Sequence, residues 1–332
     1  MVRKILIGII AVVVLAAVGG LLLPRTVHVS RSVIIERPAS LVFAVVDSFI
    51  LFPQWSPWQG LDPNMHQTTE GPREGVGAKL IWSGSSKVGS GTQLITAALP
   101  YQFVDSDLDF GNMGVAKSRI TLSPEDGATR ATWTLDVDMG ANPIGRYAGL
   151  GLDHTIGPDF ATGLAKLKVL IESMPNADTA GLDVNLVQLK ATPVLLIAES
   201  AAPDSIAGAY ADGLGRIDKF MAKNKLTQSG PPFGIDAALS PGTYSFDAGV
   251  PIDRGDAIAA DNVRVDKSYA GKALKTVYTG PYAGMMAAHD KLLAFLAAHG
   301  YTRNGAAFYR FVDDPVRTPE DQLRTEIYAP IE

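Results

Sequence analysis

Two carboxylates occupy equivalent positions in two similar segments near the carboxyl end of the chain. Asp247 lies in Ser-Phe-Asp-Ala-Gly-Val-Pro-Ile-Asp at 245–253, and Glu326 lies in Arg-Thr-Glu-Ile-Tyr-Ala-Pro-Ile-Glu at 324–332. In the second segment apolar residues alternate with mixed ones, which is the period of two of a half-buried strand. The echo predicts a duplicated half-domain with a pocket between its copies. The alternation predicts that Glu326 points away from the packed face.

Glu326 has the chemistry to bind a cation or to exchange a proton. A carboxylate that faces aromatic rings is partly desolvated, so we expect its pKa to rise, and a cation over those rings gains ~0.5 to 2 kcal/mol. If the protein is an enzyme, Glu326 is the expected general acid or base. The alternative is an acid on the wet face of an edge strand, paired with Arg324. Asp247 has no motif beyond the echo, and we interpret it as a solvated acid.

Four rings are candidates for the wall of this pocket, namely Phe233, Tyr278, Tyr282 and Tyr309. Aromatic residues on strands serve the core as often as a binding surface. Tyr282 is the strongest of the four, because Tyr-Thr-Gly-Pro-Tyr sets it at a turn from strand to helix.

Two tryptophans of the amino-terminal half, Trp58 and Trp82, are candidates to line a second cavity, although packing is the commoner use of such residues. The five histidines show no metal-ligand spacing, and we expect neither a metal nor a cofactor. No Gly-x-Ser-x-Gly elbow or phosphate-binding loop is present in the sequence, so neither a nucleophilic serine nor nucleotide chemistry is expected.

The composition excludes several classes of protein. The chain has 332 residues, a net charge of −5 and no basic run, which argues against nucleic-acid binding. It contains no cysteine, which excludes disulfides, thiolate catalysis and cysteine zinc sites. The length favours two globular units.

The first segment has the character of a membrane span. Residues 5–23 are uncharged and almost wholly apolar, and at about 1.5 Å per residue they reach roughly 28 Å, close to the ~30 Å hydrocarbon core. Leu21-Leu-Leu23 continues into Pro24 without the small-x-small site of a cleaved signal peptide, so we predict an uncleaved signal anchor. We expect a single-pass protein of the inner or cytoplasmic membrane whose soluble domains lie outside the cytoplasm.

The next part of the chain alternates in the manner of a strand meander closed by helices. A helix is expected at 38–46 and a long closing helix at 158–172. Glu125-Asp-Gly127 has the chemistry of a hairpin turn. The expected strands, each bounded by turn residues, are 27–35, 78–82, 92–98, 102–110, 117–122 and 129–137.

Three motifs make this part resemble the START-like superfamily, also called SRPBCC or the polyketide cyclase/dehydrase and lipid-transport group. They are Arg-Pro-Ala-Ser-Leu-Val-Phe at 37–43, Phe-Pro-Gln-Trp-Ser-Pro-Trp at 52–58 and Asp-Phe-Ala-Thr-Gly-Leu-Ala-Lys-Leu-Lys at 159–168. The resemblance implies a helix-grip fold, in which a curved antiparallel sheet wraps around a long helix and encloses an apolar cavity.

After a polar break at 175–181, the chain repeats one order of elements twice. The first copy is predicted as a strand at 184–199, a helix at 206–225 and strands at 233–238 and 243–251. The second copy is predicted as a strand at 262–278, a helix at 283–299 and strands at 306–312 and 322–331. Strand and helix echo together, so we predict a duplicated β-α-β-β unit.

The second part resembles the GyrI-like effector-binding domain, a small-molecule-sensing module of bacterial multidrug-responsive regulators. The motifs are Gly-Pro-Pro-Phe-Gly-Ile at 230–235, Tyr-Thr-Gly-Pro-Tyr at 278–282, Tyr309 with Asp-Pro at 314–315, and Thr-Glu-Ile-Tyr-Ala-Pro-Ile at 325–331. The resemblance implies a groove between the halves, where Glu326 attracts cationic or polar ligands. Those regulators carry a helix-turn-helix ahead of the module, and this chain has an apolar segment and the START-like part there, which argues against a transcriptional role.

Together these features predict an α+β protein with a transmembrane anchor at 1–26, a START-like domain at 27–174, a linker at 175–181 and a GyrI-like domain at 182–332. The expected function is membrane-anchored binding of an amphipathic or cationic small molecule, with a more apolar ligand in the START-like cavity. Two alternatives stay open. One is a hydrolase of strained electrophilic small molecules that uses Glu326 with a tyrosine, and the other is a regulatory partner of an envelope protein.

Overall fold

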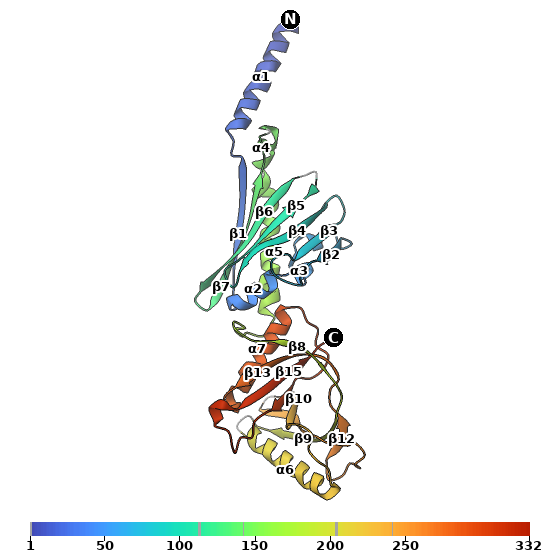
Figure 1. The fold of residues 1–332 in the computed structure, drawn as a ribbon. Coiled ribbons are helices and arrows are strands. Elements are labelled where there is room, and N and C mark those ends of the chain that lie inside the picture. The colour runs from blue at the N-terminus through green and yellow to red at the C-terminus, as the bar shows by residue number, and fades with distance from the viewer. Residues whose placement is uncertain (1, 112–113, 142, 203–204, 241) are drawn as a thin grey trace. The chain divides into compact units, whose positions relative to one another are not determined.

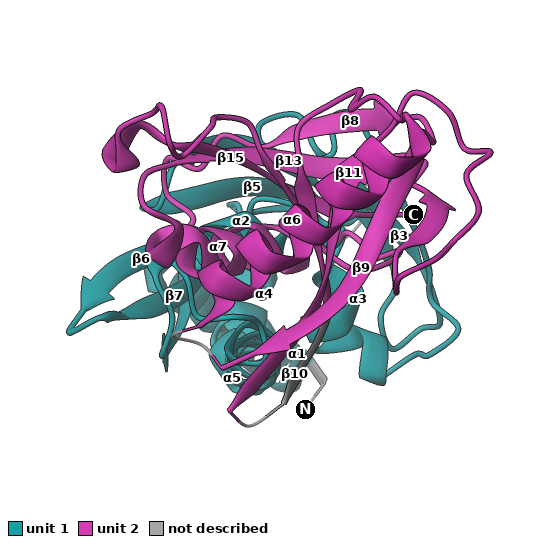
Figure 2. Ribbon diagram, turned by 90° about the horizontal axis from the view of Figure 1, so that it is seen from below, with its two compact units in different colours: residues 1–178, 298–300 teal, residues 179–297, 301–332 magenta. Residues whose placement is uncertain are grey.

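The computed structural model describes residues 2–111, 114–141, 143–202, 205–240 and 242–332. These residues form two compact units, one of residues 1–178 with 298–300 and one of residues 179–297 with 301–332 (Figure 2). Each unit has its own sheet and its own hydrophobic core.

The chain begins with helix α1 (Val2–Leu22), drawn in blue in Figure 1. Its side chains are largely exposed, and Arg3–Leu22 is long and apolar enough to cross a membrane. A signal sequence has the same length and composition. Within the described residues it is the one helix with this character.

The sheet of the first unit is a seven-stranded antiparallel meander in the order β1-β7-β6-β5-β4-β3-β2. The turn between β6 and β7 confirms the predicted hairpin, because Asp126 (φ 47°) and Gly127 (φ 83°) both adopt the left-handed backbone that such a turn requires. The sequence pattern missed β2, whose residues are polar and mostly exposed. The strands are β1 (Thr26–Ile35), β2 (His66–Glu70), β3 (Lys79–Ser83), β4 (Ser90–Leu99), β5 (Phe103–Asp109), β6 (Val115–Glu125) and β7 (Ala128–Asp138).

Helices cover the concave side of this sheet, and the longest of them packs along β1. That helix begins at Leu152 and passes through Pro158, so the predicted start at 158 is wrong. Pro158 removes one backbone hydrogen bond from this helix, whose residues on either side, Ile156 and Phe160, both line the interior cavity. The helices are α2 (Ala39–Val46), α3 (Phe52–Trp55), the 3-10 turn η1 (Trp58–Gly60), α4 (Pro143–Gly149) and α5 (Leu152–Glu172).

The second unit is built on an eight-stranded sheet whose order, β12-β9-β11-β10-β14-β15-β13-β8, has the symmetry of a duplication. Strands β9, β11 and β10 of the first copy mirror β13, β15 and β14 of the second copy. The two copies meet where β10 pairs with β14. The strands are β8 (Asn185–Leu189), β9 (Pro193–Ala201), β10 (Phe233–Ser240), β11 (Thr243–Pro251), β12 (Arg264–Lys267), β13 (Gly271–Thr279), β14 (Phe308–Phe311) and β15 (Arg324–Pro330).

Two segments that the pattern predicts as single strands, 184–199 and 262–278, are each divided in two. Strand β8 pairs with β13 of the other copy, and β12 pairs with β9, so each copy lends its first strand to its partner copy. The breaks lie against each other, because the Thr192 amide donates to Ser268 Oγ at 3.0 Å and the Ser268 amide donates to the Thr192 carbonyl at 2.9 Å. Such an exchange between distant strands leaves no mark in local periodicity.

Two helices, α6 (Ile206–Asn224) and α7 (Met285–Ala298), bury one face of this sheet. Helix α6 packs on the first copy through Ile217 and Phe220, and α7 packs on the second copy through Leu292 and Leu296. The opposite face carries two apolar groups, one around Phe233 and one around Phe308 and Tyr328, and Ile235 packs against both. Short 3-10 turns lie at Tyr282–Gly284 and Glu320–Gln322.

Candidate functional site

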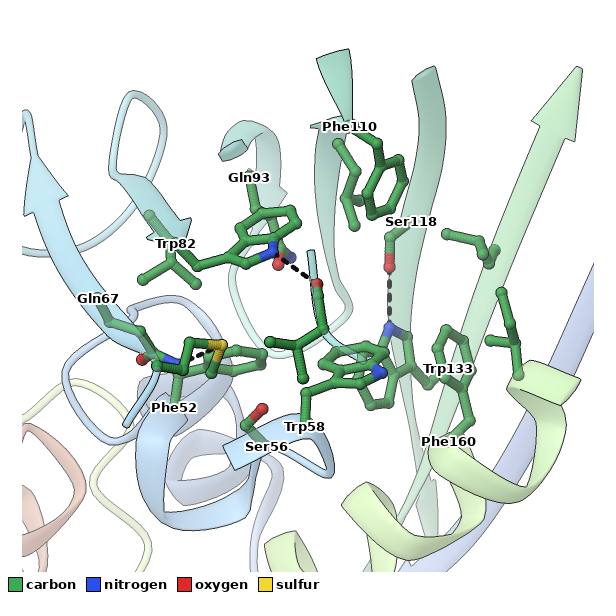
Figure 3. Close-up of a pocket in the computed structure, with 16 residues that line it drawn as sticks. Phe52, Ser56, Trp58, Gln67, Trp82, Gln93, Phe110, Ser118, Trp133 and Phe160 are labelled. Atoms are coloured by element: carbon green, nitrogen blue, oxygen red, sulfur yellow. Dashed lines mark hydrogen bonds between the residues drawn. The ribbon is translucent and has the colours of Figure 1, made fainter. Parts of the chain in front are cut away.

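The first unit contains a cavity of about 140 Å³ between the sheet and the helices (Figure 3). Strands β3 to β7 supply one side, and α3, η1 and α5 supply the other. Trp133 of β7 and Phe160 of α5 stack face to face at 3.9 Å, and Trp58 approaches Trp133 edge-on at 5.8 Å. The aromatic lining residues are Phe52, Trp58, Trp82, Phe110, Trp133 and Phe160.

Both tryptophans that the sequence nominates lie in the wall of this cavity. The Trp82 ring meets Phe110 edge-on at 5.7 Å, and its indole nitrogen donates to the Val88 carbonyl at 3.3 Å. This satisfies the polar end of Trp82 and fixes the ring plane. That these rings hold a ligand stays a prediction.

Four polar side chains also reach the cavity, namely Ser56, Gln67, Gln93 and Ser118. Ser118 Oγ accepts a 2.8 Å hydrogen bond from the Trp133 indole nitrogen, as the dashed line in Figure 3 marks. By contrast, Ser56 Oγ and Gln67 Oε1 are buried and have no hydrogen-bond partner among the described residues. Buried polar atoms are normally paired.

Among the described residues, the lining of the cavity includes no Asp, Glu, Lys, Arg or His and is therefore electrically neutral. An ion that entered it would lose its hydration without gaining an opposite charge, which is costly in an apolar site. The cavity therefore suits an uncharged ligand with a hydrogen-bonding group.

In the second unit, Glu326 lies on the sheet face opposite the helices, as the alternation of β15 predicts. Its partner is Lys275 of β13, whose Nζ donates to Oε1 at 2.6 Å, and not Arg324, which pairs with Asp313. Tyr328 Oη donates to the other carboxylate oxygen at 2.6 Å. Both oxygens of Glu326 are thus occupied, and the side chain is only about one-fifth exposed (21%).

The expected rise in the pKa of Glu326 is wrong. Burial by itself raises the pKa, but the hydrogen bonds from Lys275 and Tyr328 and the positive charge of Lys275 and Arg310 outweigh it, so the pKa is lowered. Arg310 of β14 lies 4.9 Å above the Tyr328 ring and donates to its hydroxyl at 3.2 Å. The cluster of Glu326, Lys275 and Arg310 therefore carries one more positive than negative charge.

The three tyrosines expected beside Glu326 are not there. Glu326 pairs with Val277 on one side and with Arg310 on the other. Tyr278 follows Val277 and Tyr309 precedes Arg310, and because side chains alternate along a strand both tyrosines point to the helix-covered face. Tyr282 lies in the turn after β13 and packs edge-on against Phe311, also on that side. Phe308 and Tyr328 do lie on the Glu326 face, where their rings stack at 4.6 Å.

Phe233 and Asp247 occupy the first copy of the duplicated unit. Phe233 is 5% exposed and packs with Val194 and Leu196 on the face away from the helices. Asp247 is not a solvated acid, because it forms a 2.6 Å ion pair with Arg264 and its side chain is 22% exposed. Each acid is thus neutralised by a cation from another strand of the sheet, Asp247 by Arg264 of β12 and Glu326 by Lys275 of β13.

The sequence pattern did not reveal a polar cluster under the helices, centred on Asp236 of β10. Its Oδ2 accepts a 2.8 Å hydrogen bond from Tyr309, its Oδ1 accepts one from Tyr244, and the ring of His289 stands 3.7 Å away. Burial and the nearby Asp236 charge raise the pKa of Tyr309. The four residues come from β10, β14, β11 and α7, so no spacing along the chain could have signalled the cluster.

The part of the chain that the structure describes contains no evident metal site. Within those residues, no three His, Cys, Asp or Glu side chains stand together in a way that could hold a metal ion.

Comparison with protein families assigns both units. Residues 26–172 match the family described as polyketide cyclase / dehydrase and lipid transport, and residues 182–332 match the GyrI-like small molecule binding domain. The chain is therefore a fusion of a START-like domain with a GyrI-like small-molecule-binding domain, as the motifs predict. No curated protein matches this chain.

Solved structures resemble parts of this chain, and each of the following matches covers less than half of it. The C-terminal domain of EcmrR is 16% identical over 46% of this chain and 98% of that chain, with a TM-score of 0.42. A hydrolase encoded by lin2189 from Listeria innocua is 11% identical over 46% and 94%, with a TM-score of 0.35. Ara h 8.0201 is 14% identical over 43% and 97%, with a TM-score of 0.32.

Proposed function

We propose that this protein is a membrane-anchored small-molecule binding protein whose principal ligand site is the aromatic cavity of the START-like unit. The observation that carries the proposal is the pair of buried polar atoms, Ser56 Oγ and Gln67 Oε1, that have no hydrogen-bond partner among the described residues and lie in a cavity with a mainly aromatic and aliphatic lining. An unpaired buried polar group costs about 1 to 3 kcal/mol. A ligand that hydrogen-bonds to these atoms removes that cost, so the bound state is favoured.

The size and charge of the cavity define the class of ligand. Its volume of about 140 Å³ is close to that of a cavity that holds benzene, ~150 Å³. The neutral lining excludes ions for the reason given above. We therefore propose an uncharged ligand, or the uncharged part of a larger amphipathic one, that presents a single ring or a short branched chain with one hydrogen-bonding group.

We propose further that α1 anchors the chain as a single-pass protein of the inner or cytoplasmic membrane, with both domains outside the cytoplasm. The apolar surface of α1 supports this, because isoleucine, leucine and valine side chains are more than half exposed along most of its length. Flotation of the full chain with liposomes tests the anchoring. Protease access in sealed membrane vesicles of known orientation tests the side on which the domains lie.

We propose a second ligand site at Glu326 in the GyrI-like unit, for an anionic ligand and not for the cationic ligand that the sequence predicts. Because Lys275 and Tyr328 occupy both carboxylate oxygens, an incoming cation has to displace Lys275 before it reaches Glu326. The surplus positive charge of Lys275 and Arg310 favours an anionic group that lies against the Phe308 and Tyr328 rings. A general acid must hold a proton at the working pH, and the lowered pKa of Glu326 argues against that role in a hydrolase.

Calorimetric titration of the full chain in detergent with benzyl alcohol and indole tests the principal site. Val88 lines the cavity, so Val88→Phe fills part of it and is expected to weaken binding about tenfold or more. Val76→Phe adds the same bulk at a position that is 58% exposed and is expected to leave binding unchanged. Equal affinities for the two variants and the parent would rule out the cavity as the ligand site.

A further inference from the structure

Helix α4 lies directly against the carboxyl end of α1 (Figure 1). Arg146 donates from Nη1 to the carbonyls of Leu21 at 2.7 Å and Leu23 at 3.1 Å. These carbonyls lie at the end of α1 and one residue beyond it, where the last carbonyl groups of a helix have no N–H donor within the helix. Arg146 therefore caps α1 and fixes α4 to it.

A second contact reaches deeper along α1. The Tyr147 hydroxyl donates to the Ala16 carbonyl at 3.0 Å. Gly19 and Gly20 make this approach possible, because a Cβ on Gly20 would stand 2.6 Å from Pro143 Cβ and one on Gly19 would stand 2.6 Å from the Tyr147 hydroxyl. Both distances are shorter than a van der Waals contact allows. Gly20 is required for close packing because its neighbour is the rigid Pro143, whereas a side chain at Gly19 would displace the Tyr147 hydroxyl.

The rest of α4 and the residue beyond it present apolar side chains to the outside. Ile144 is 77% exposed, Leu150 is 64% exposed and Tyr147 is 43% exposed. Residues 143–150 contain no acid, and their one cation, Arg146, is directed at backbone carbonyls. A surface of this kind favours an apolar environment.

The depth of the contact matches the boundary of a bilayer. Helix α1 has 21 residues, and at about 1.5 Å each they span the ~30 Å hydrocarbon core. Ala16 lies six residues before Leu22, or ~9 Å inside the end of α1. Interfacial helices lie with their apolar faces ~5–10 Å into the boundary between headgroups and acyl chains.

We propose that α4, with the residue that follows it, inserts beside α1 into the headgroup boundary of a lipid bilayer. The inference rests on the proposed anchoring by α1, and lipid is the occupant because the surface continues the apolar surface of that helix. Ile156, in the cavity wall, lies in the first turns of α5, the helix that begins two residues after Leu150. The bilayer contact thus holds the START-like cavity at the membrane surface, where an apolar ligand dissolved in the lipid is within reach.

Single labelled cysteines in the full chain test this proposal, because the protein has no cysteine of its own. Ile144→Cys and Leu150→Cys carry an environment-sensitive fluorophore, and the protein is reconstituted in phosphatidylcholine vesicles. We expect iodide in the water to quench both labels about fivefold less than a control label, and spin-labelled lipid to quench them strongly. The control is Val169→Cys, an aliphatic position on α5 that is 70% exposed.

The outcomes separate the inference from the anchoring on which it rests. If the protein floats with the vesicles but iodide quenches all three labels alike, the docking surface is refuted and the anchor stands. If the labels are shielded from iodide but spin-labelled lipid does not quench them, protein covers the surface and the proposal fails. If the protein does not float, anchoring and inference fail together. Gly20→Val is expected to separate α4 from α1 and restore iodide quenching at Leu150→Cys.

Discussion

Two serines in the wall of the same cavity are expected to respond in opposite ways when each is replaced by alanine. Ser118 Oγ accepts the hydrogen bond of the buried Trp133 indole nitrogen. Ser56 Oγ is equally buried and has no such partner among the described residues. Ser118→Ala leaves a buried donor unsatisfied, whereas Ser56→Ala removes a buried group that is already unsatisfied. The two changes delete the same atom type, so the comparison isolates the hydrogen bond.

The expected size of each effect follows from the cost of an unpaired buried polar group, about 1 to 3 kcal/mol. Ser118→Ala should lose this amount of unfolding free energy. In a unit of this size each kcal/mol moves Tm by about 2–4 °C, so Tm should fall by roughly 2–12 °C. Ser56→Ala should leave Tm unchanged or raise it. In the bound state the Ser56 hydroxyl is expected to contribute about 0.5–1.5 kcal/mol, so its loss should weaken ligand affinity roughly 2- to 12-fold.

Intrinsic tryptophan fluorescence is the suitable assay. The chain has four tryptophans, at 55, 58, 82 and 133, and all of them belong to the first unit, so the thermal transition reports that unit alone. Ser123→Ala is the matched control, because Ser123 lies on the same strand as Ser118 but is exposed. Titration with benzyl alcohol gives the affinities of the same variants.

One result would refute the reasoning directly. If Ser56→Ala lowers Tm as much as Ser118→Ala does, then Ser56 Oγ already has a hydrogen-bond partner in the folded protein. A ligand would then gain no free energy by bonding to it. If neither variant differs from Ser123→Ala, the hydrogen bond between Trp133 and Ser118 contributes no stability.

Three further predictions concern charge. Lys275→Met frees the Glu326 carboxylate and is expected to raise the affinity for ethidium at least severalfold in a fluorescence titration. The control Lys272→Met, at an exposed neighbouring position, should leave the affinity unchanged. An unchanged affinity of Lys275→Met for ethidium would show that cations do not reach Glu326. Burial, and secondly the negative charge of Glu74, raise the pKa of Asp47 from its ordinary 3.8 to about 6. The folded state therefore binds the proton more tightly than the unfolded state, and the free energy of unfolding falls as the pH rises from about 4 to about 6. Asp47→Asn should therefore raise Tm near pH 7 but not near pH 4, with the exposed Asp107→Asn as a flat control; a pH-independent difference would contradict the shift. Benzoate and benzylammonium should bind the cavity at least about tenfold more weakly than benzyl alcohol, since the lining offers no counter-charge, and equal calorimetric affinities would contradict a neutral site.

Much of the fold was predictable because it depends on neighbours in the sequence. The alternation of β1 and β7, the Asp-Gly turn between β6 and β7 and the stripe of α5 are properties of short segments, and the structure has them where the pattern predicts them. The division of 184–199 and 262–278 was not predictable. Each of those segments changes partners in the middle, and the preference of single residues for extended backbone is the same on both sides of the break.

For the candidate sites, the sequence by itself determined the residue types, the strands that carry most of them and the side of the strand on which Glu326 lies. Period-two alternation was enough to turn Glu326 away from the helix-covered face, and the tryptophan-rich motif at 52–58 marked the wall of a cavity. Tertiary structure alone decided the partners. The pairing of β13 with β15 brings Lys275 to Glu326 across 51 residues of chain, and the pairing of β10 with β14 brings Tyr309 to Asp236 across 73. A side chain's face is set by local backbone geometry, whereas its pKa and its free hydrogen-bonding atoms are set by whichever distant strand becomes its neighbour.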